Sequence, residues 1–306
     1  MSALLHQDGV EPGLQVAFDE PMIVGESPLW HSLEHCLYWV DIDGFAIHRL
    51  HPESGAHKKW TAPSEPTALG LCEDGTLVVA LRDGFARFNS ASGLFTPLAV
   101  APYDTATARF NDGRVDAAGR FWVGTMYEPK DARKAAMYVL ERGAVRCAWE
   151  GGMTTSNGLA FSADGRYMYH ADTPSHRIDR YRFDVASGEL GAAEAFQRFD
   201  ADKSAPGYGG RPDGAAVDSE GAYWVAMFEG SRLLRFDASG ALLREVKLPL
   251  RCPTMMAFGG ADLRTLYITS AGARRPLEER TRYPLSGCLL ALRVEVPGRL
   301  ETAYLP

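Results

Sequence analysis

Oxygen-bearing side chains recur at one fixed position of a pattern that appears six times along the chain. Each copy is a short strand-like stretch, a turn and a second apolar stretch, and its first residue is a carboxylate, a carboxamide or a hydroxyl. These first residues are Glu26, Thr67, Asn111, Asn157, Asp213 and Thr254. Polar groups drawn into an apolar interior cost free energy unless they are paired or coordinate an ion. Each position alone is also typical of a turn, but together the six predict one shared polar site.

Glu26, Asn157 and Asp213 are the members of this set that best suit a metal ion. They supply oxygen ligands and two negative charges, with no Cys or His at the equivalent positions. Such ligands are typical of hard or borderline divalent cations. Three protein ligands leave positions open for water and substrate, which is the arrangement of a catalytic metal. We therefore expect one divalent cation as cofactor, with Ca²⁺ as the first choice and Mg²⁺, Mn²⁺, Zn²⁺ or Fe²⁺ as alternatives.

Asp213 is the residue that we expect to act as the catalytic base. A bound cation polarises a carbonyl oxygen and lowers the pKa of water, and a carboxylate that touches both metal and water accepts the proton during attack. Asp213 follows a glycine-rich segment at residues 202–211, which gives the site an adjustable wall. Glu26 is the second choice for this role.

Arg109 and Asn111 are the candidate substrate-binding residues. Arg109 stands two residues before Asn111, on the same side of its strand, and suits a hydroxylated or anionic ligand. Asn111 brings both a donor and an acceptor. The alternative for Arg109 is an ordinary surface arginine.

The elements that must position these residues are strands. A third and a weaker fourth strand follow each copy, and their period-two alternation and glycine-containing turns predict antiparallel hairpins. The copies start roughly 40–55 residues apart, a spacing typical of four-stranded propeller blades. We therefore predict an all-β fold, a six-bladed β-propeller with four antiparallel strands per blade, rather than a β-sandwich. Residues 1–306 form one domain in this prediction, residues 1–14 are a flexible N-terminus, and residues 15–18 pair with the last blade.

Composition narrows the partners and the compartment. A formal net charge of −7 and a pI near 5.7 argue against nucleic acid or an anionic membrane as partner. The five cysteines are widely spaced without a C-x-x-C pair, which indicates buried thiols and a reducing compartment. No leader with a basic and an apolar region precedes residue 14, and no apolar run is long enough for a membrane helix. We expect a cytoplasmic protein with a small-molecule partner. The oligomeric state stays open and is compatible with a monomer.

Four motifs, in order, resemble the regucalcin/gluconolactonase family across residues 25–292. They are GESPLW at 25–30, RFNDG at 109–113 with GRFWVGTM at 119–126, SNGLAFS at 156–162 and PDGAAVD at 212–218. The resemblance implies a six-bladed propeller that holds one divalent cation and hydrolyses sugar lactones. It places the metal ligands on Glu26, Asn157 and Asp213, with Asp213 also the base, and the substrate contacts on Arg109 and Asn111.

The chain departs from this family in one loop. The resemblance implies a substrate-contacting glutamate after GRFWVGTM, but Pro129 occupies the aligned place and Glu128 stands beside it. We take Glu128 as the candidate, and the sugar need not be gluconolactone. The segments HADT at 170–173 and YPLSG at 283–287 look more like those of bacterial pentonolactone and aldonolactone hydrolases.

The leading hypothesis is metal-dependent hydrolysis of an aldonolactone, such as glucono-, xylono-, arabinono- or galactonolactone, to the aldonic acid. A different class of protein, a non-catalytic calcium-binding or regulatory propeller, would use the same ligands as a static ion site. A third alternative is a metal-dependent organophosphate or aryl-ester hydrolase. Arg109 and the polar residues around it argue against that third alternative, because such substrates are mainly apolar.

Overall fold

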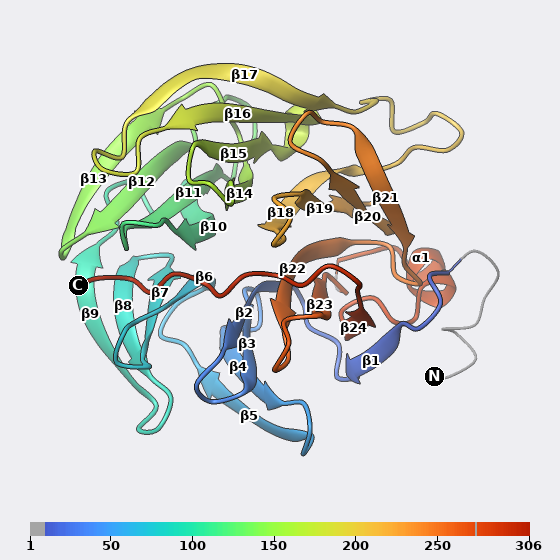
Figure 1. Cartoon of the computed structure of the whole chain (residues 1–306), viewed down its shortest axis with the longest axis horizontal. Coiled ribbons are helices and arrows are strands. Elements are labelled where there is room, and N and C mark those ends of the chain that lie inside the picture. Colours follow the sequence, from blue (N-terminus) through green and yellow to red (C-terminus); the bar gives the residue numbers. More distant parts are fainter. Residues whose placement is uncertain (1–9, 273) are drawn as a thin grey trace.

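The structure, a computed structural model, describes residues 10–272 and 274–306 and consists of six four-stranded antiparallel sheets arranged around a central axis (Figure 1). Blade 1 contains β2 (Gly25–His31), β3 (Cys36–Asp41), β4 (Ala46–His51) and β5 (Ala56–Thr61). Blade 2 contains β6 (Pro66–Leu71), β7 (Leu77–Leu81), β8 (Gly84–Asn89) and β9 (Leu94–Val100). Blade 3 contains β10 (Ala108–Val115), β11 (Phe121–Tyr127), β12 (Ala136–Glu141) and β13 (Ala144–Glu150).

The second half of the ring repeats this plan. Blade 4 contains β14 (Ser156–Phe161), β15 (Tyr167–Asp172), β16 (Arg177–Phe183) and β17 (Leu190–Arg198). Blade 5 contains β18 (Arg211–Val217), β19 (Tyr223–Phe228), β20 (Arg232–Phe236) and β21 (Leu242–Lys247). Blade 6 contains β22 (Pro253–Gly259), β23 (Thr265–Ser270), β24 (Leu289–Arg293) and β1 (Gln15–Phe18). Among the described residues, the 3₁₀-helix η2 (Thr173–Ser175) and the helix α1 (Leu277–Arg282) lie in loops.

The predicted all-β six-bladed propeller is confirmed, and so is its closure by the N-terminal strand. β1 pairs antiparallel with β24, with Gln15 opposite Ala291, and thereby supplies the outermost strand of blade 6. The chain thus leaves neither its first nor its last blade incomplete. Of the predicted flexible segment, residues 1–14, the first nine lie outside the described residues.

The hydrophobic core is divided into six clusters, each of which joins two neighbouring blades. Trp39, Trp122 and Trp224 are fully buried in three of these clusters. They pack one blade against the next. Burial of apolar surface between blades is the main stabilising term of such a ring, at about 25 cal/mol per Å².

The first strand of each blade lies innermost, and the six innermost strands contact their neighbours in a closed ring. The predicted polar residues stand on these strands. Among the described residues, no helix is long and apolar enough to cross a membrane. Each of the five cysteines is a free thiol, and four of the five are buried.

Candidate metal and substrate site

Every innermost strand is irregular where its polar residue stands. The register of pairing with the second strand shifts within Glu26–Leu29, Pro66–Ala68, Phe110–Gly113, Asn157–Ala160, Pro212–Ala215 and Pro253–Met256. Bulges of this kind interrupt the ladder and re-aim a side chain. Local sequence contributes, because Gly158 takes a left-handed φ of 62° and a Cβ there would lie 2.7 Å from the Tyr223 hydroxyl. The repeated bulge therefore gives each blade one side chain that does not follow the regular alternation.

A continuous chain of hydrogen bonds links the candidate residues of blades 3, 4 and 5. Arg109 donates to Oδ1 of Asn111 over 2.9 Å, and Nδ2 of Asn111 donates to Oδ1 of Asn157 over 2.9 Å. Nδ2 of Asn157 donates to the Thr173 hydroxyl over 2.8 Å, and this hydroxyl donates to the Pro212 carbonyl over 2.7 Å. The network fixes which way the Asn157 amide points and leaves its Oδ1 with one lone pair for a further partner.

Three carboxylates from blades 1, 3 and 5 interact electrostatically. Burial, and then repulsion by Asp112, raises the pKa of Glu26 to about 8. Burial, and then repulsion by Glu26, raises the pKa of Asp213 well above its usual range, while Arg109 and Arg211 oppose that change. Burial raises the pKa of Asp112 to about 6, against a hydrogen bond of 2.8 Å from the Leu159 amide. Their mutual repulsion places these carboxylates within a common low-dielectric site.

The donor set of this site fits a divalent cation. Asp213 is only 6% exposed, yet within the described ranges its carboxylate accepts no hydrogen bond. Glu26 accepts one, from the amide of Ser27. A cation would relieve the repulsion between two buried, poorly satisfied carboxylates. In the part of the chain that the structure describes, no three His, Cys, Asp or Glu side chains form a ligand cluster.

The two threonines of the predicted set hold backbone groups instead. The Thr67 hydroxyl donates to the Ala80 carbonyl over 3.3 Å, and the Thr254 hydroxyl donates to the Gly25 carbonyl over 2.5 Å. Thr254 thereby ties blade 6 to the strand that carries Glu26. The residues of the set that remain available to a ligand are the carboxylates and the carboxamides: Glu26, Asp213, Asn111 and Asn157.

Glu128 lies beside Arg109 but is bound mainly by another arginine. Arg82 grips both carboxylate oxygens of Glu128, over 2.8 and 2.9 Å, and this pairing lowers the pKa of Glu128. Nε of Arg109 is 3.9 Å from Glu128. Arg82 also pairs with Glu65 over 2.8 Å, so it anchors the loop that carries Glu128.

Three residues of this site were not singled out by the sequence analysis: Arg82, Asp112 and Thr173. Asp112 carried a signal, since it lies inside the RFNDG motif. Thr173 ends the HADT segment, but its bond to Pro212 crosses from blade 4 to blade 5. Arg82 carried no signal, because its partner Glu128 comes from another blade. Asp172, at the end of β15, accepts hydrogen bonds from the amides of Thr154 and Thr155 over 2.9 and 3.0 Å. It thus holds the chain that leads into Asn157.

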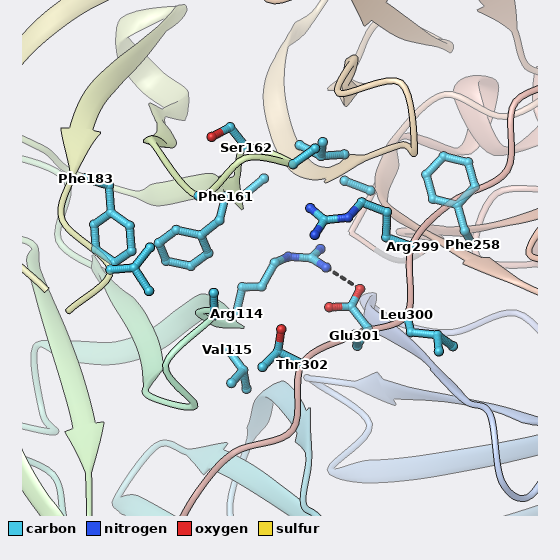
Figure 2. A pocket seen from close by; sticks show the side chains of 17 residues that line it. Arg114, Val115, Phe161, Ser162, Phe183, Phe258, Arg299, Leu300, Glu301 and Thr302 are labelled. Carbon is cyan, nitrogen blue, oxygen red and sulfur yellow. Dashed lines mark hydrogen bonds and ion pairs between the residues drawn. The ribbon is translucent and has the colours of Figure 1, made fainter.

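A pocket lies at the opposite end of the inner strands (Figure 2). Its lining includes Arg114, which follows Asn111 on β10, and residues of the C-terminal segment. Arg114 donates to the carbonyls of Leu159 over 3.2 Å and Ala215 over 2.6 Å, and it pairs with Glu301 over 2.5 Å. Glu301 is the one carboxylate among the lining residues, and its charge is already matched. This pocket is therefore not the candidate site.

Comparison with known proteins identifies relatives over nearly the whole chain. Residues 24–272 match the family model described as the SMP-30/Gluconolactonase/LRE-like region. A 6-deoxy-6-sulfogluconolactonase from Pseudomonas putida is 44% identical over 291 residues, which covers 95% of this chain and 98% of that protein. A pentonolactonase from Haloferax volcanii is 35% identical, with 91% and 93% covered.

A solved structure supports the same relationship. The crystal structure of a calcium-binding protein, regucalcin, from Agrobacterium tumefaciens matches with a TM-score of 0.90 and 29% identity, and covers 97% of this chain and 98% of that one. The resemblance expected from the four motifs is thus confirmed over almost the whole length. The chain belongs to the SMP-30/gluconolactonase/LRE-like family.

Proposed function

We propose that the protein hydrolyses a sugar lactone to the aldonic acid and needs one divalent cation held by Glu26, Asn157 and Asp213. One observation carries the metal site: the buried carboxylates of Glu26 and Asp213 repel each other, and Glu26 accepts only one hydrogen bond while Asp213 accepts none among the described residues. The Asn157 amide oxygen, which accepts one hydrogen bond from Asn111, is the third ligand of this proposal. Relatives named as sugar lactonases support the reaction.

The oxygen-only donor set suits Ca²⁺ first and other divalent cations second. When bound, such a cation supplies polarisation of the lactone carbonyl and stabilises the charge that develops on its oxygen. Glu26 and Asp213 would be held ionised at neutral pH beside such a charge, which would oppose the desolvation that raises their pKa values.

Asp213 takes the proton of the attacking water in this proposal. A bond forms between the water oxygen and the carbonyl carbon, the ring C–O bond breaks, and the proton passes to the departing ring oxygen. Arg109 and Asn111 hold sugar hydroxyls, since Arg109 is almost fully buried and its guanidinium is oriented by Asn111. Glu128, held by Arg82, contacts the sugar from the loop beside Arg109.

Two groups of substrates are candidates. Neutral glucono-, xylono-, arabinono- and galactonolactones fit the polar residues around the proposed ligands. The lactone of a 6-deoxy-6-sulfo sugar is supported by the Pseudomonas putida relative at 44% identity.

The test combines hydrolysis with metal analysis. Wild type is stripped with chelator, reloaded with Ca²⁺, Mg²⁺, Mn²⁺ or Zn²⁺, and assayed with a pH indicator on both groups of lactones. We expect activity to vanish on stripping and return with metal. Asp213→Ala should lose turnover, whereas Asp164→Ala, in an exposed turn of blade 4, should retain it. Full lactone hydrolysis by Asp213→Ala would refute the assignment.

A calcium-binding propeller without turnover is the second candidate function. The solved structure from Agrobacterium tumefaciens is titled a calcium-binding protein. Tight Ca²⁺ binding by calorimetry, together with no hydrolysis of any lactone in the panel, would favour this function over the first.

A further inference from the structure

Two long loops near the candidate site carry cationic side chains. Residues 127–134 follow β11 and contain Lys130, and residues 202–211 precede β18 and contain Lys203 and Arg211. Tyr127 is paired with Ala108 and Arg211 with Phe228, so the first loop lies at the end of β10, which carries Arg109 and Asn111, and the second lies at the start of β18, which carries Asp213. We call Lys130, Lys203 and Arg211 the cationic rim.

The rim has more positive charge than its carboxylates neutralise. Glu229 receives Lys203 over 2.9 Å, Arg211 over 3.4 Å and also Arg275 over 3.0 Å. Arg275 is also matched by Glu279, over 2.6 and 2.7 Å, so Glu229 is left as the shared carboxylate of the two rim cations Lys203 and Arg211. Within the described ranges, the Lys130 ammonium forms no ion pair with a carboxylate. Both carboxylate oxygens of the neighbouring Glu128 accept hydrogen bonds from Nη1 and Nη2 of Arg82.

Arg211 is positioned by packing and keeps donors free. Its guanidinium stacks 5.3 Å from the centre of the Phe228 ring, and its side chain is 22% exposed. Nε of Arg211 is buried and has no hydrogen-bond partner among the described residues. Guanidinium groups in this condition bind planar or tetrahedral oxyanions through several N–H groups at once.

The three cations act on one another. Partial burial of its ammonium, followed by the charges of Arg211, Arg109 and Lys203, lowers the pKa of the exposed Lys130. Mutual repulsion of this kind is relieved when an anion binds between the cations. Arg211 stands two residues before Asp213 on β18, so one small substrate can span the rim and the proposed base.

We propose that the cationic rim is a subsite for an anionic substituent of the sugar lactone, such as a sulfonate or a phosphate at the end of the sugar remote from the ester carbonyl. This proposal rests on the proposed lactonase function and gives it a substrate class. Sulfonate and phosphate share the oxyanion chemistry that Lys130 and Arg211 recognise, and the experiment separates them.

The experiment compares kcat/KM of the metal-loaded protein on gluconolactone, 6-phosphogluconolactone and 6-deoxy-6-sulfogluconolactone. We expect one or both charged lactones to exceed gluconolactone by about tenfold or more, as charge-assisted hydrogen bonds predict. Lys130→Gln should remove most of that advantage, mainly through KM, and leave gluconolactone nearly unchanged. Lys130→Arg should restore it. Lys134→Gln, an exposed cation of the same loop that contacts the Tyr127 ring, is the matched control and should have no effect.

A second measurement keeps the proposal testable without turnover. Calorimetry compares binding of 6-phosphogluconate and 6-deoxy-6-sulfogluconate with that of gluconate, at low and at raised salt. We expect tighter, salt-sensitive binding of the charged-end ligands, weakened by Lys130→Gln. Hydrolysis of gluconolactone with no preference for either charged lactone would overturn the subsite and leave the lactonase function standing. If no lactone is hydrolysed but anions bind in a way that depends on the cationic rim, the lactonase function would be overturned and the anion subsite would stand.

Discussion

At the residue scale, the side-chain amide of Asn157 is oriented by two neighbours. Its amide oxygen accepts from Asn111, and its amide nitrogen donates to Thr173. An asparagine without such partners presents oxygen and nitrogen alternately, and only the oxygen binds a cation. The single hydroxyl of Thr173 also reaches the Pro212 carbonyl, next to Asp213. Thr173 thus joins two of the three proposed ligands without being one itself.

Thr173→Val should therefore weaken cation binding although it removes no ligand. Valine keeps the shape but leaves the Asn157 amide nitrogen and the Pro212 carbonyl unpaired, which costs about 1–3 kcal/mol of stability. Loss of a residue that orients a ligand typically lowers metal affinity by roughly 10–100-fold. Calorimetric titration with Ca²⁺ and denaturant unfolding measure the two effects.

Thr125→Val is the control for that variant. The Thr125 hydroxyl also bonds two backbone groups, the amide and the carbonyl of Ala136, but both belong to its own blade. We expect it to lose stability and to keep its Ca²⁺ affinity. Equal affinities in wild type and Thr173→Val would show that Asn157 is oriented by other contacts.

At the element scale, the strands were largely predictable and the irregularities within them were not. Period-two alternation and turn residues located the four strands of each blade, because both features follow from local backbone geometry. The bulges depend on what the neighbouring strand offers. The roles of Thr67 and Thr254 likewise depend on carbonyls supplied from other strands. The sequence therefore identified the six polar positions, but it could not show that Thr67 and Thr254 bind backbone carbonyls.

Glu128 illustrates the same limit. The sequence marked it as a candidate substrate contact, and in the structure it lies 3.9 Å from Nε of Arg109. Its dominant partner is Arg82, which lies 46 residues earlier and comes from another blade. No local pattern predicts such a contact, because loop-to-loop distances are set by the packing of whole blades.

The outer strands of blade 1 contain an imidazole pair that should make stability sensitive to acid. His48 on β4 is 1% exposed, stacks on Trp39, and its Nδ1 is 3.0 Å from Nε2 of His57 on β5. Burial, followed by the charges of His57 and Lys59, lowers the pKa of His48 from 6.5 to about 3. The folded state therefore keeps His48 neutral in a pH range where the unfolded chain is protonated.

Below about pH 6.5 the unfolded state binds more protons at this position, so stability falls as pH falls. One such group contributes about 1.4 kcal/mol per pH unit between the unfolded and folded pKa values. Unfolding free energies of wild type and His48→Gln are measured with denaturant at pH 4, 5, 6 and 7. Their difference gives the contribution of His48 to the pH dependence of stability. The variant should show the shallower pH dependence. Parallel curves would mean that His48 titrates alike in the folded and unfolded states.

At the scale of the whole molecule, the ring is closed twice. β1 completes blade 6 at the outer edge. The C-terminal segment crosses the end of the channel opposite the candidate site (Figure 1), where the amide of Tyr304 donates to the Leu71 carbonyl and that of Leu305 to the Gly119 carbonyl. Blades 2 and 3 are thereby joined to the C-terminal segment, which forms no named strand after β24. The sequence patterns did not predict this contact.

Arg114 connects this tail to the candidate site. Its guanidinium donates to the carbonyls of Leu159 and Ala215, each two residues beyond a proposed ligand, Asn157 and Asp213. Glu301 of the tail supplies the matching charge. Because Arg114 is 12% exposed, removal of that partner leaves a nearly buried cation without its counterion.

Glu301→Gln should therefore destabilise the whole propeller and loosen the site together. We expect a loss of about 2 kcal/mol in unfolding free energy, below the roughly 3–5 kcal/mol of a fully buried pair because Glu301 is 23% exposed. Ca²⁺ affinity should fall in the same variant, since β14 and β18 lose a common clamp. Glu295→Gln, an exposed glutamate of the same segment, is the matched control and should change neither quantity. If Glu301→Gln unfolds at the wild-type midpoint, the tail merely covers the channel, and the spacing of Asn157 and Asp213 is set by the inner strands alone.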